Sequence, residues 1–250
     1  MAHELKFMII TKNSKIAQVA AQNKVRIMID IERNGKQARQ GHKDTFISDH
    51  QFEDLSALKE EFPEAEFILR INPLYKNTCI EVEEGISRGA DHIMLPMFRK
   101  AEEVQRTADF IRGRIPLIPL VETGSALVHL DKICDVSGVQ EIHLGLNDLS
   151  IDMQLDFCFE PLFGGLVDLF CTKARIKNKI YGFGGISTIG SGLLPAEDIL
   201  KEHARLGSQR IILSRSFIKN VEAKCASEIS FDSVFTQELL NITDCYAKGV

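Results

Sequence analysis

Apolar residues recur along the chain in short runs that have no polar stripe on either alternating face. Such runs are typical of parallel strands that helices cover on both sides. Polar segments separate them, so each run predicts one strand. We expect eight strands: Lys6–Thr11, Val25–Ile31, Glu66–Asn72, His92–Phe98, Pro116–Glu122, Glu141–Asp148, Ile180–Ser187 and Arg210–Phe217.

Segments with helical periodicity lie between these runs. They include residues 54–62, 100–114, 124–133, 196–207 and a final helix at about 232–248. Eight strands alternating with helices, without a linker or low-complexity segment, predict an α/β fold of the (β/α)8 TIM-barrel type. The length of 250 residues matches one barrel, so residues 1–250 are expected to form a single domain. A doubly wound open sheet is the structural alternative.

Charged and amide side chains collect where the predicted strands end, which is the face where barrel active sites lie. The strongest pair is Glu122, in PLVETGSA, and Asp148, in GLNDLS, at the ends of the fifth and sixth predicted strands. Two neighbouring carboxylates repel each other unless a cation or a shared proton lies between them. Hard oxygen ligands suit Mg²⁺ or Mn²⁺. Alternatively, Glu122 stabilises the start of the next helix and Asp148 caps a loop.

The overall composition argues against several classes of protein. The formal net charge is -5 at pH 7, which does not suit a protein that neutralises a nucleic-acid backbone. No stretch approaches the roughly 18 apolar residues of a membrane helix, and the N-terminal apolar run is too short for a signal peptide. The six cysteines form no CxxC pair and have no zinc-like spacing. We therefore expect a cytoplasmic protein with no nucleic-acid or membrane partner.

Several motifs, taken in order, resemble the HpcH/HpaI aldolase and citrate lyase family of metal-dependent (β/α)8 barrels. Each motif alone is weak, but the ordered set is specific and covers about the first two thirds of the chain. The matching stretches are IDIERNGKQAR (29–39), LRINPL (69–74), GADHIMLPMFRKAEE (89–103), PLVETGSALVHLDKI (119–133) and LGLNDLS (144–150).

The resemblance implies a lyase that makes or breaks a carbon–carbon bond next to the carbonyl of a 2-oxo acid or an acyl thioester such as a CoA ester. Glu122 and Asp148 stand at the family's two ligand positions for Mg²⁺ or Mn²⁺, and Arg70 stands at its substrate-binding arginine. The metal would stabilise an enolate as a Lewis acid, and Arg70 would add a fixed donor fork. Backbone N–H groups of Leu146, Asn147 and Asp148 would hold the substrate carboxylate. The alternative for Arg70 is a salt bridge across the barrel rim.

The resemblance also implies a homo-oligomer, expected to be a hexamer built from dimers, in which the final helix packs on a neighbouring barrel. An apolar stripe on that helix is suited to such packing, although the helix can instead cover its own barrel. The stripe consists of Val234, Leu239, Leu240, Ile242 and Tyr246.

The sequence departs from the family where a catalytic base is expected. Aldolases of the family commonly carry a histidine after the Asp-x-Glu of the second strand, working with an aspartate on the third helix. Here Arg33 follows Glu32, and Arg88 occupies the best-aligned position on the third helix. DIERNGKQAR is closer to the citrate-lyase-like branch. Candidates for the base are Glu32, Lys36 and His42 in the polar second loop, and we assign the catalytic role to Glu32; alternatively, this loop is merely solvated.

A second group of residues supports a rival function. Gly184 and Gly185 close the predicted seventh strand, and Ser214, Arg215 and Ser216 close the eighth. In many barrels these loops hold a phosphate through backbone N–H groups, which would suit an isomerase or synthase with a phosphorylated substrate. Two glycines can equally serve close packing. A third hypothesis is a degenerate, non-catalytic barrel that binds a metabolite, and the missing His/Asp dyad favours it.

Overall fold

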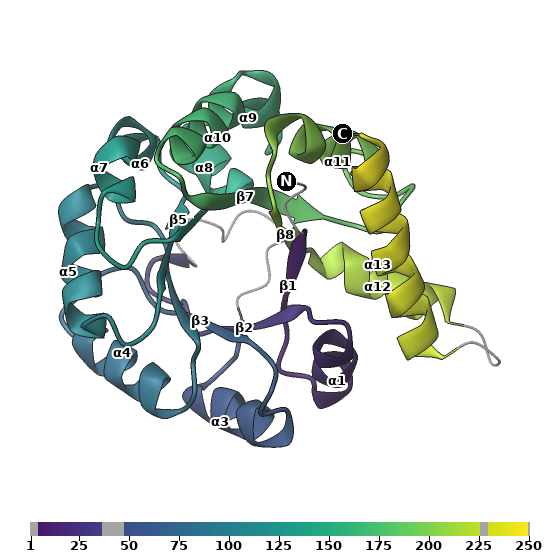
Figure 1. Cartoon of the computed structure of the whole chain (residues 1–250), viewed down its shortest axis with the longest axis horizontal. Coiled ribbons are helices and arrows are strands. Elements are labelled where there is room, and N and C mark those ends of the chain that lie inside the picture. The colour runs from purple at the N-terminus through teal and green to yellow at the C-terminus, as the bar shows by residue number, and fades with distance from the viewer. Residues whose placement is uncertain (1–4, 37–47, 226–229, 250) are drawn as a thin grey trace.

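The computed structural model describes residues 5–36, 48–225 and 230–249. Eight parallel strands pair in chain order and the last pairs with the first, so the sheet closes into a barrel (Figure 1). The TIM-barrel prediction is confirmed and the open-sheet alternative is wrong. The strands are β1 (Lys6–Ile10), β2 (Arg26–Asp30), β3 (Phe67–Arg70), β4 (His92–Leu95), β5 (Leu117–Val121), β6 (Glu141–Leu144), β7 (Ile180–Ile186) and β8 (Arg210–Leu213).

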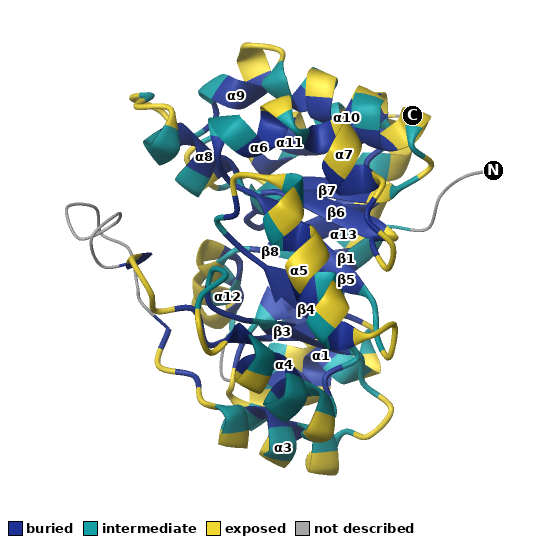
Figure 2. Ribbon diagram, turned by 90° about the vertical axis from the view of Figure 1, so that its left-hand side faces the viewer, coloured by how far each residue is buried: buried dark blue, intermediate teal, exposed yellow. Residues whose placement is uncertain are grey.

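Helices surround the barrel, with their exposed residues on the outside and the buried strands at the centre (Figure 2). Within the described ranges, no helix is both long and apolar enough to cross a membrane. The helices are α1 (Ser14–Gln22), α3 (Phe52–Glu61), α4 (Thr78–Ser87), α5 (Ala101–Ile111), α6 (Gly124–Val128), α7 (Leu130–Cys134), α8 (Leu146–Asp152), α9 (Glu160–Phe163), α10 (Leu166–Ile176), α11 (Ala196–Leu206), α12 (Arg215–Lys224) and α13 (Phe231–Lys248).

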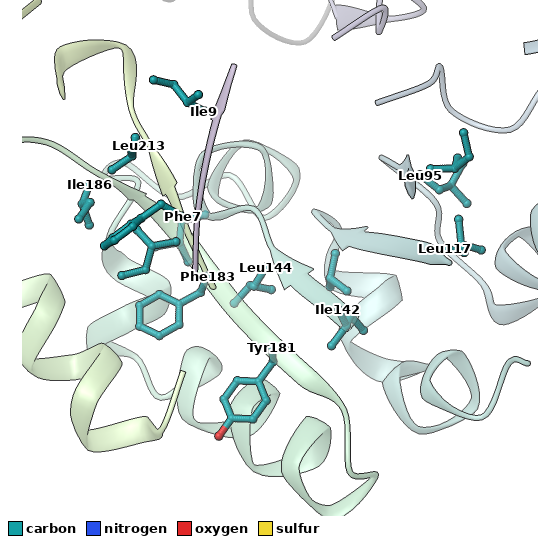
Figure 3. Close-up of a cluster of buried hydrophobic side chains, with 14 of the residues drawn as sticks. Phe7, Ile9, Leu95, Leu117, Ile142, Leu144, Tyr181, Phe183, Ile186 and Leu213 are labelled. Carbon is teal, nitrogen blue, oxygen red and sulfur yellow. The ribbon is translucent and has the colours of Figure 1, made fainter. Parts of the chain in front are cut away.

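Apolar side chains fill both sides of the sheet. A larger cluster lies between strands and helices, and includes Phe7, Ile142 and Phe183 (Figure 3). In that cluster Phe183 stacks on His203 of α11, with ring centroids 3.8 Å apart. Burial on both faces explains why the strand sequences do not alternate between apolar and polar residues. A separate, smaller cluster comes from the strands alone: Met8, Met28, Ile68, Met94, Ile118 and Leu120.

Charged side chains close the N-terminal end of the barrel. The carboxylate of Glu141 accepts hydrogen bonds from Arg26 at 2.6 and 3.0 Å and from Nε of Arg210 at 2.9 Å. Burial alone would raise the pKa of the Glu141 carboxyl, but the two arginines lower it below its ordinary value. Interactions at this end of a barrel serve stability, because active sites lie at the other end.

At the C-terminal end the strands stop earlier than the apolar runs predict, most clearly β6 and β8. β6 ends before Gly145, which is the N-cap of α8, so Asp148 lies in the first turn of that helix and not on a strand. Similarly, β8 ends before Ser214, whose hydroxyl caps α12 by accepting the N–H of Phe217. In both places the start of a helix ends the strand before its apolar run is complete.

The final helix, α13, packs on α11 and α12 of its own barrel. It buries Phe235, Leu239 and Ile242, whereas Leu240 remains 52% exposed. The chain itself therefore covers much of the stripe that we expected a neighbouring subunit to cover. Packing of the remaining surface on a partner stays a prediction.

Candidate active site

A pocket of about 570 Å³ opens at the C-terminal end of the barrel. Its lining includes Arg70, Glu122, Asn147 and Asp148, together with a mostly apolar remainder. Pockets that enclose small ligands have volumes of ~300–1,000 Å³. A pocket of about 630 Å³ at the opposite end, beside α1 and α13, lacks this combination of residues. Four of the residues singled out from the sequence, Arg70, Glu122, Asn147 and Asp148, therefore meet in one cavity.

Glu122 follows β5 and is 3% exposed. Its Oε2 accepts the backbone N–H of Met97, in the loop after β4, at 3.3 Å. Its side chain also lies against Gly145, where an added Cβ would come within 2.6 Å of Cγ and 2.8 Å of Oε1 of Glu122. The carboxylate is thus held between the loop after β4 and the turn that leads to Asp148, and the glycine makes room for it.

Leu146, Asn147 and Asp148 form the first turn of α8, and all three line the pocket. Backbone N–H groups in a first turn lack partners within the helix and favour an anion nearby. The N–H groups predicted to hold the substrate carboxylate therefore lie at the pocket. Their part in substrate binding stays a prediction.

Arg70 ends β3, and its guanidinium is held by Asp30 at the end of β2. Nε and Nη2 of Arg70 donate to the two carboxylate oxygens of Asp30 at 2.8 and 2.6 Å. Burial alone would lower the pKa of Arg70, but the charge and hydrogen bonds of Asp30, with the charges of Glu32 and Glu122, raise it above its ordinary value. Arg70 is therefore a permanent cation. Within the described part of the chain, the hydrogen bonds of Arg70 come from Nε and Nη2.

The sequence pattern did not single out Asp30, although it is 2% exposed and central to the rim. Besides Arg70, it accepts a hydrogen bond from Nζ of Lys36 at 3.0 Å. Burial alone would raise the pKa of Asp30, but these two cations hold it well below its usual range, so the carboxylate stays ionised. Its place at the C-terminal end of the second predicted strand was the available signal, because barrel active sites lie at that face.

Glu32 is also buried, with its carboxylate 3.4 Å from Nζ of Lys36 and 3.7 Å from Nε of Arg70. It lies beside Arg70 but is not among the residues that line the pocket. Its role as a base therefore stays a prediction. His42, another candidate, lies outside the described residues.

Asn72 fixes the start of the loop that carries Glu32. Its Oδ1 accepts the N–H groups of Arg33 and Asn34 at 2.8 and 2.9 Å, and its Nδ2 donates to Glu81 of α4 at 2.7 Å. The end of β3 thereby holds the chain that leaves β2, which keeps the neighbouring Glu32 and Arg70 together.

The two positions of the family's His/Asp dyad carry arginines with other partners. Arg33 donates through Nη2 to the carbonyl of His50 at 3.0 Å. Arg88, after α4, pairs with Glu84 at 2.9 Å and with Glu53 at 3.0 Å. Neither arginine lines the pocket, so neither takes the place of the dyad there.

The donor set of the pocket fits Mg²⁺ or Mn²⁺. Across the described ranges, no three His, Cys, Asp or Glu side chains are grouped to hold a metal ion. Zinc takes three or four protein ligands, whereas Mg²⁺ keeps several waters and needs only one or two carboxylates together with substrate oxygens. Glu122 and Asp148, both lining an open pocket, meet that smaller requirement.

Gly184 and Gly185 lie within β7, and Gly184 is used for packing. Gly184 has a φ of +56°, and an added Cβ would come within 2.9 Å of Leu146. The hydroxyl of Ser214 already accepts the N–H of Phe217 and is hydrogen-bonded to Ser216 at 2.7 Å. Gly184 and the Ser214 hydroxyl thus have structural roles, whereas phosphate binding by backbone N–H groups here stays the rival prediction.

A closed parallel barrel with a carboxylate pair and a fixed arginine in one pocket at its C-terminal end defines a TIM barrel with a small-molecule site. The chain belongs to the HpcH/HpaI aldolase/citrate lyase family, whose model matches residues 7–157. The match contains Arg70, Glu122 and Asp148, and it confirms the resemblance seen in the motifs. No curated protein sequence matches the chain.

Solved structures share this fold at low sequence identity. The HpcH/HpaI aldolase from Desulfitobacterium hafniense DCB-2 is 15% identical with a TM-score of 0.66, over 91% of this chain and 96% of its own. The citrate synthase SbnG is 18% identical with a TM-score of 0.65, over 88% and 91%. The citrate lyase beta subunit from M. tuberculosis, solved with oxaloacetate and magnesium, is 15% identical with a TM-score of 0.60, over 94% and 97%. At these identities the likeness shows the fold.

Proposed function

We propose that the protein is a metal-dependent carbon–carbon lyase that acts next to the carbonyl of a 2-oxo acid or an acyl thioester. The observation that carries this proposal is the meeting of Glu122, Asp148 and Arg70 on one pocket. Membership of an aldolase and citrate lyase family supports the reaction class. A fold relative solved with oxaloacetate and magnesium supports a 2-oxo acid and Mg²⁺.

Glu122 and Asp148 would hold the metal, which when bound supplies Lewis-acid stabilisation of the charge that bond cleavage leaves on the carbonyl oxygen. Arg70 would donate to the same oxygen. Asp30 takes the N–H of Nε and one of the two N–H groups of Nη2, so Nη1 and the second N–H of Nη2 are the donors left for the substrate. The guanidinium is already oriented, so stabilising the developing charge requires little reorganisation. The first turn of α8 would bind the substrate carboxylate.

Glu32 is our candidate for the group that moves the proton. Its carboxylate lies 3.7 Å from Nε of Arg70, so it is next to the group that would face the reacting carbonyl. Lys36, 3.4 Å from Glu32, is the alternative. No histidine of the described chain lines the pocket, which supports a base other than that of the histidine-containing aldolases.

The proposal is tested by release of pyruvate or oxaloacetate from 4-hydroxy-2-oxo acids and acyl-CoA esters, with and without Mg²⁺ or Mn²⁺. Calorimetry with Mn²⁺ tests the metal site directly. The double variant Glu122→Gln, Asp148→Asn should lose Mn²⁺ binding, whereas the surface variant Glu83→Gln should keep it. Unchanged Mn²⁺ affinity in the double variant would defeat the proposed site, and binding of inorganic phosphate without metal would favour the rival isomerase or synthase.

We also propose a cytoplasmic location and a homo-oligomeric assembly. All six cysteines are unpaired, which is consistent with a reducing compartment. Burial raises the pKa of Cys134 to about 11 and that of Cys171 to about 12, so both thiols stay protonated and unreactive. The assembly is what the resemblance to the family implies, and Leu240 on α13 is a part of the expected apolar stripe that stays exposed.

A further inference from the structure

Most of the surface that lines the pocket is apolar, and the charged groups make up only a small part of it. Side chains from four separate parts of the chain contribute to this wall. They are Ile16 of α1, Phe159 between α8 and α9, Leu193 and Leu194 between β7 and α11, and Ile218 of α12. A substrate no larger than pyruvate would use the charged groups and leave this apolar wall uncovered.

Leu193 is 83% exposed, the largest exposed fraction of any large apolar side chain in the described chain. An isolated exposed leucine needs no explanation. Leu193, however, lies on the wall of the pocket that carries the proposed reaction site. An apolar group bound there would remove both itself and the leucine from water, which is favourable in proportion to the apolar area buried.

The loop that carries Leu193 is held in place by side-chain hydrogen bonds. Asn220 of α12 donates through Nδ2 to the hydroxyls of Ser187, Thr188 and Ser191, at 3.0, 3.1 and 2.8 Å. The loop is therefore attached to α12, which itself contributes Ile218 to the pocket. The loop that carries Leu193 is thus already held in place before a ligand binds, so binding an apolar group requires little ordering of the protein.

The charges around the pocket argue against a second carboxylate on the substrate. The charged residues that line it within the described chain are Arg70, Glu122, Asp148, Arg215 and Lys219. The first three form the proposed reaction site, and the last two are exposed to water. A carboxylate beside the apolar wall would forgo the apolar burial that a methyl group gains there, and the two exposed cations would return little, because exposed ion pairs contribute only ~0–1 kcal/mol.

We infer that the substrate is a 2-oxo acid whose chain beyond the reacting carbons is apolar, and that Leu193 determines specificity for that chain. The placement of the 2-oxo acid rests on the proposed function. The class of compound is therefore a 4-hydroxy-2-oxo acid with an alkyl or aryl end, which breaking the bond between C3 and C4 would split into pyruvate and an apolar aldehyde.

Calorimetry with Mg²⁺ present tests this with two compounds that lyases of this type cannot cleave. 2-Oxoheptanoate and 2-oxoheptanedioate have the same chain length and differ in a terminal methyl or carboxylate group. We expect 2-oxoheptanoate to bind at least about fourfold more tightly, the effect of burying one methylene. Leu193→Ala should weaken its binding several-fold and leave pyruvate binding unchanged. Because Leu193 is mostly exposed, this variant should keep the stability of the wild type.

Ile176→Ala is the matched control. Ile176 is also largely exposed, at 69%, but it ends α10 just before β7 begins, at the end of the barrel away from the pocket. This variant should bind both compounds like the wild type. If 2-oxoheptanedioate binds as tightly as 2-oxoheptanoate, if neither binds, or if Leu193→Ala binds 2-oxoheptanoate like the wild type, the inference is overturned.

A cleavage assay keeps failure of the inference separate from failure of the proposed function. If the wild type cleaves 4-hydroxy-2-oxo acids with a carboxylate end but binds 2-oxoheptanoate poorly, the lyase function stands and the apolar specificity is wrong. If 2-oxoheptanoate binds tightly through Leu193 but no 4-hydroxy-2-oxo acid or acyl-CoA ester is cleaved, the apolar site stands and the proposed reaction is wrong.

Discussion

Replacing Arg70 with lysine should lower both turnover and stability, with the larger effect on turnover, because the arginine holds Asp30 and is also proposed to stabilise the reacting oxygen. Lysine keeps the positive charge but cannot span both oxygens of Asp30, which Arg70 contacts at 2.8 and 2.6 Å. Loss of one hydrogen bond between charged groups costs ~1.5–3 kcal/mol. For a chain of this size, that loss lowers Tm by roughly 3–12 °C.

The effect on the reaction is expected to be larger. Loss of one donor to a developing oxyanion typically lowers kcat by ~10²–10³. The charge that Arg70 faces grows in the transition state, so kcat should fall and KM should change little. Both constants are measured by pyruvate release with a cleavable 4-hydroxy-2-oxo acid, and Tm by scanning calorimetry, on Arg70→Lys and Arg70→Ala.

Arg114→Lys is the matched control for Arg70→Lys. Arg114 also contacts both oxygens of its partner, Glu83, at 2.7 Å each, but the two side chains are 36% and 44% exposed. Exposed pairs contribute only ~0–1 kcal/mol, so this variant should keep its kcat and nearly all of its Tm. An Arg70→Lys protein that is destabilised but fully active would refute the reasoning and leave Arg70 as a rim salt bridge.

Four further outcomes are expected. Gly145→Ala should displace Glu122, because the new Cβ would lie 2.6 Å from Cγ of Glu122. The variant should bind Mn²⁺ at least about tenfold more weakly, a loss of ~1.4 kcal/mol, and unchanged affinity in calorimetry would contradict this. Burial lowers the pKa of His203 to about 3, below the ~6.5 of an unfolded chain. As pH falls below 6.5, the unfolded state therefore takes up the proton first, and the free energy of unfolding decreases. His203→Gln should make this decrease smaller in urea titrations between pH 7 and 4.5. A decrease as steep as that of the wild type would contradict the prediction. Glu141→Gln leaves Arg26, which is 1% exposed, without its main counter-charge. The variant should lose ~3–5 kcal/mol of unfolding free energy and keep the kcat of the wild type when folded. A large loss of kcat would mean that Glu141 and its arginines take part in the reaction. Light scattering at micromolar concentration should give the mass of a homo-oligomer, and a monomeric mass would rule the assembly out.

The barrel and the outline of its site could be predicted from local sequence. A run such as VRIMIDI, apolar on both faces, is stable only where both faces are covered, and eight such runs alternating with helices leave few arrangements other than a closed parallel barrel. Glu122 and Arg70 could be found because the ends of parallel strands share one rim. These inferences depend on periodicity and chain direction, which are local properties.

Tertiary structure decided which of these groups touch. Asp30 holds Arg70 because β2 and β3 pair in a register that sets these two residues side by side, although they are 40 positions apart in the chain. The apolar run through residue 148 predicted a longer strand, but the turn at Gly145 moved Asp148 onto α8. In the sequence, Leu193 is an ordinary loop residue. Its place beside the pocket is visible only in the structure, where Asn220 holds the loop through its hydrogen bonds. Composition and periodicity determine which segments must be buried, whereas contacts between distant side chains depend on strand register and packing, which exist only once the barrel has closed.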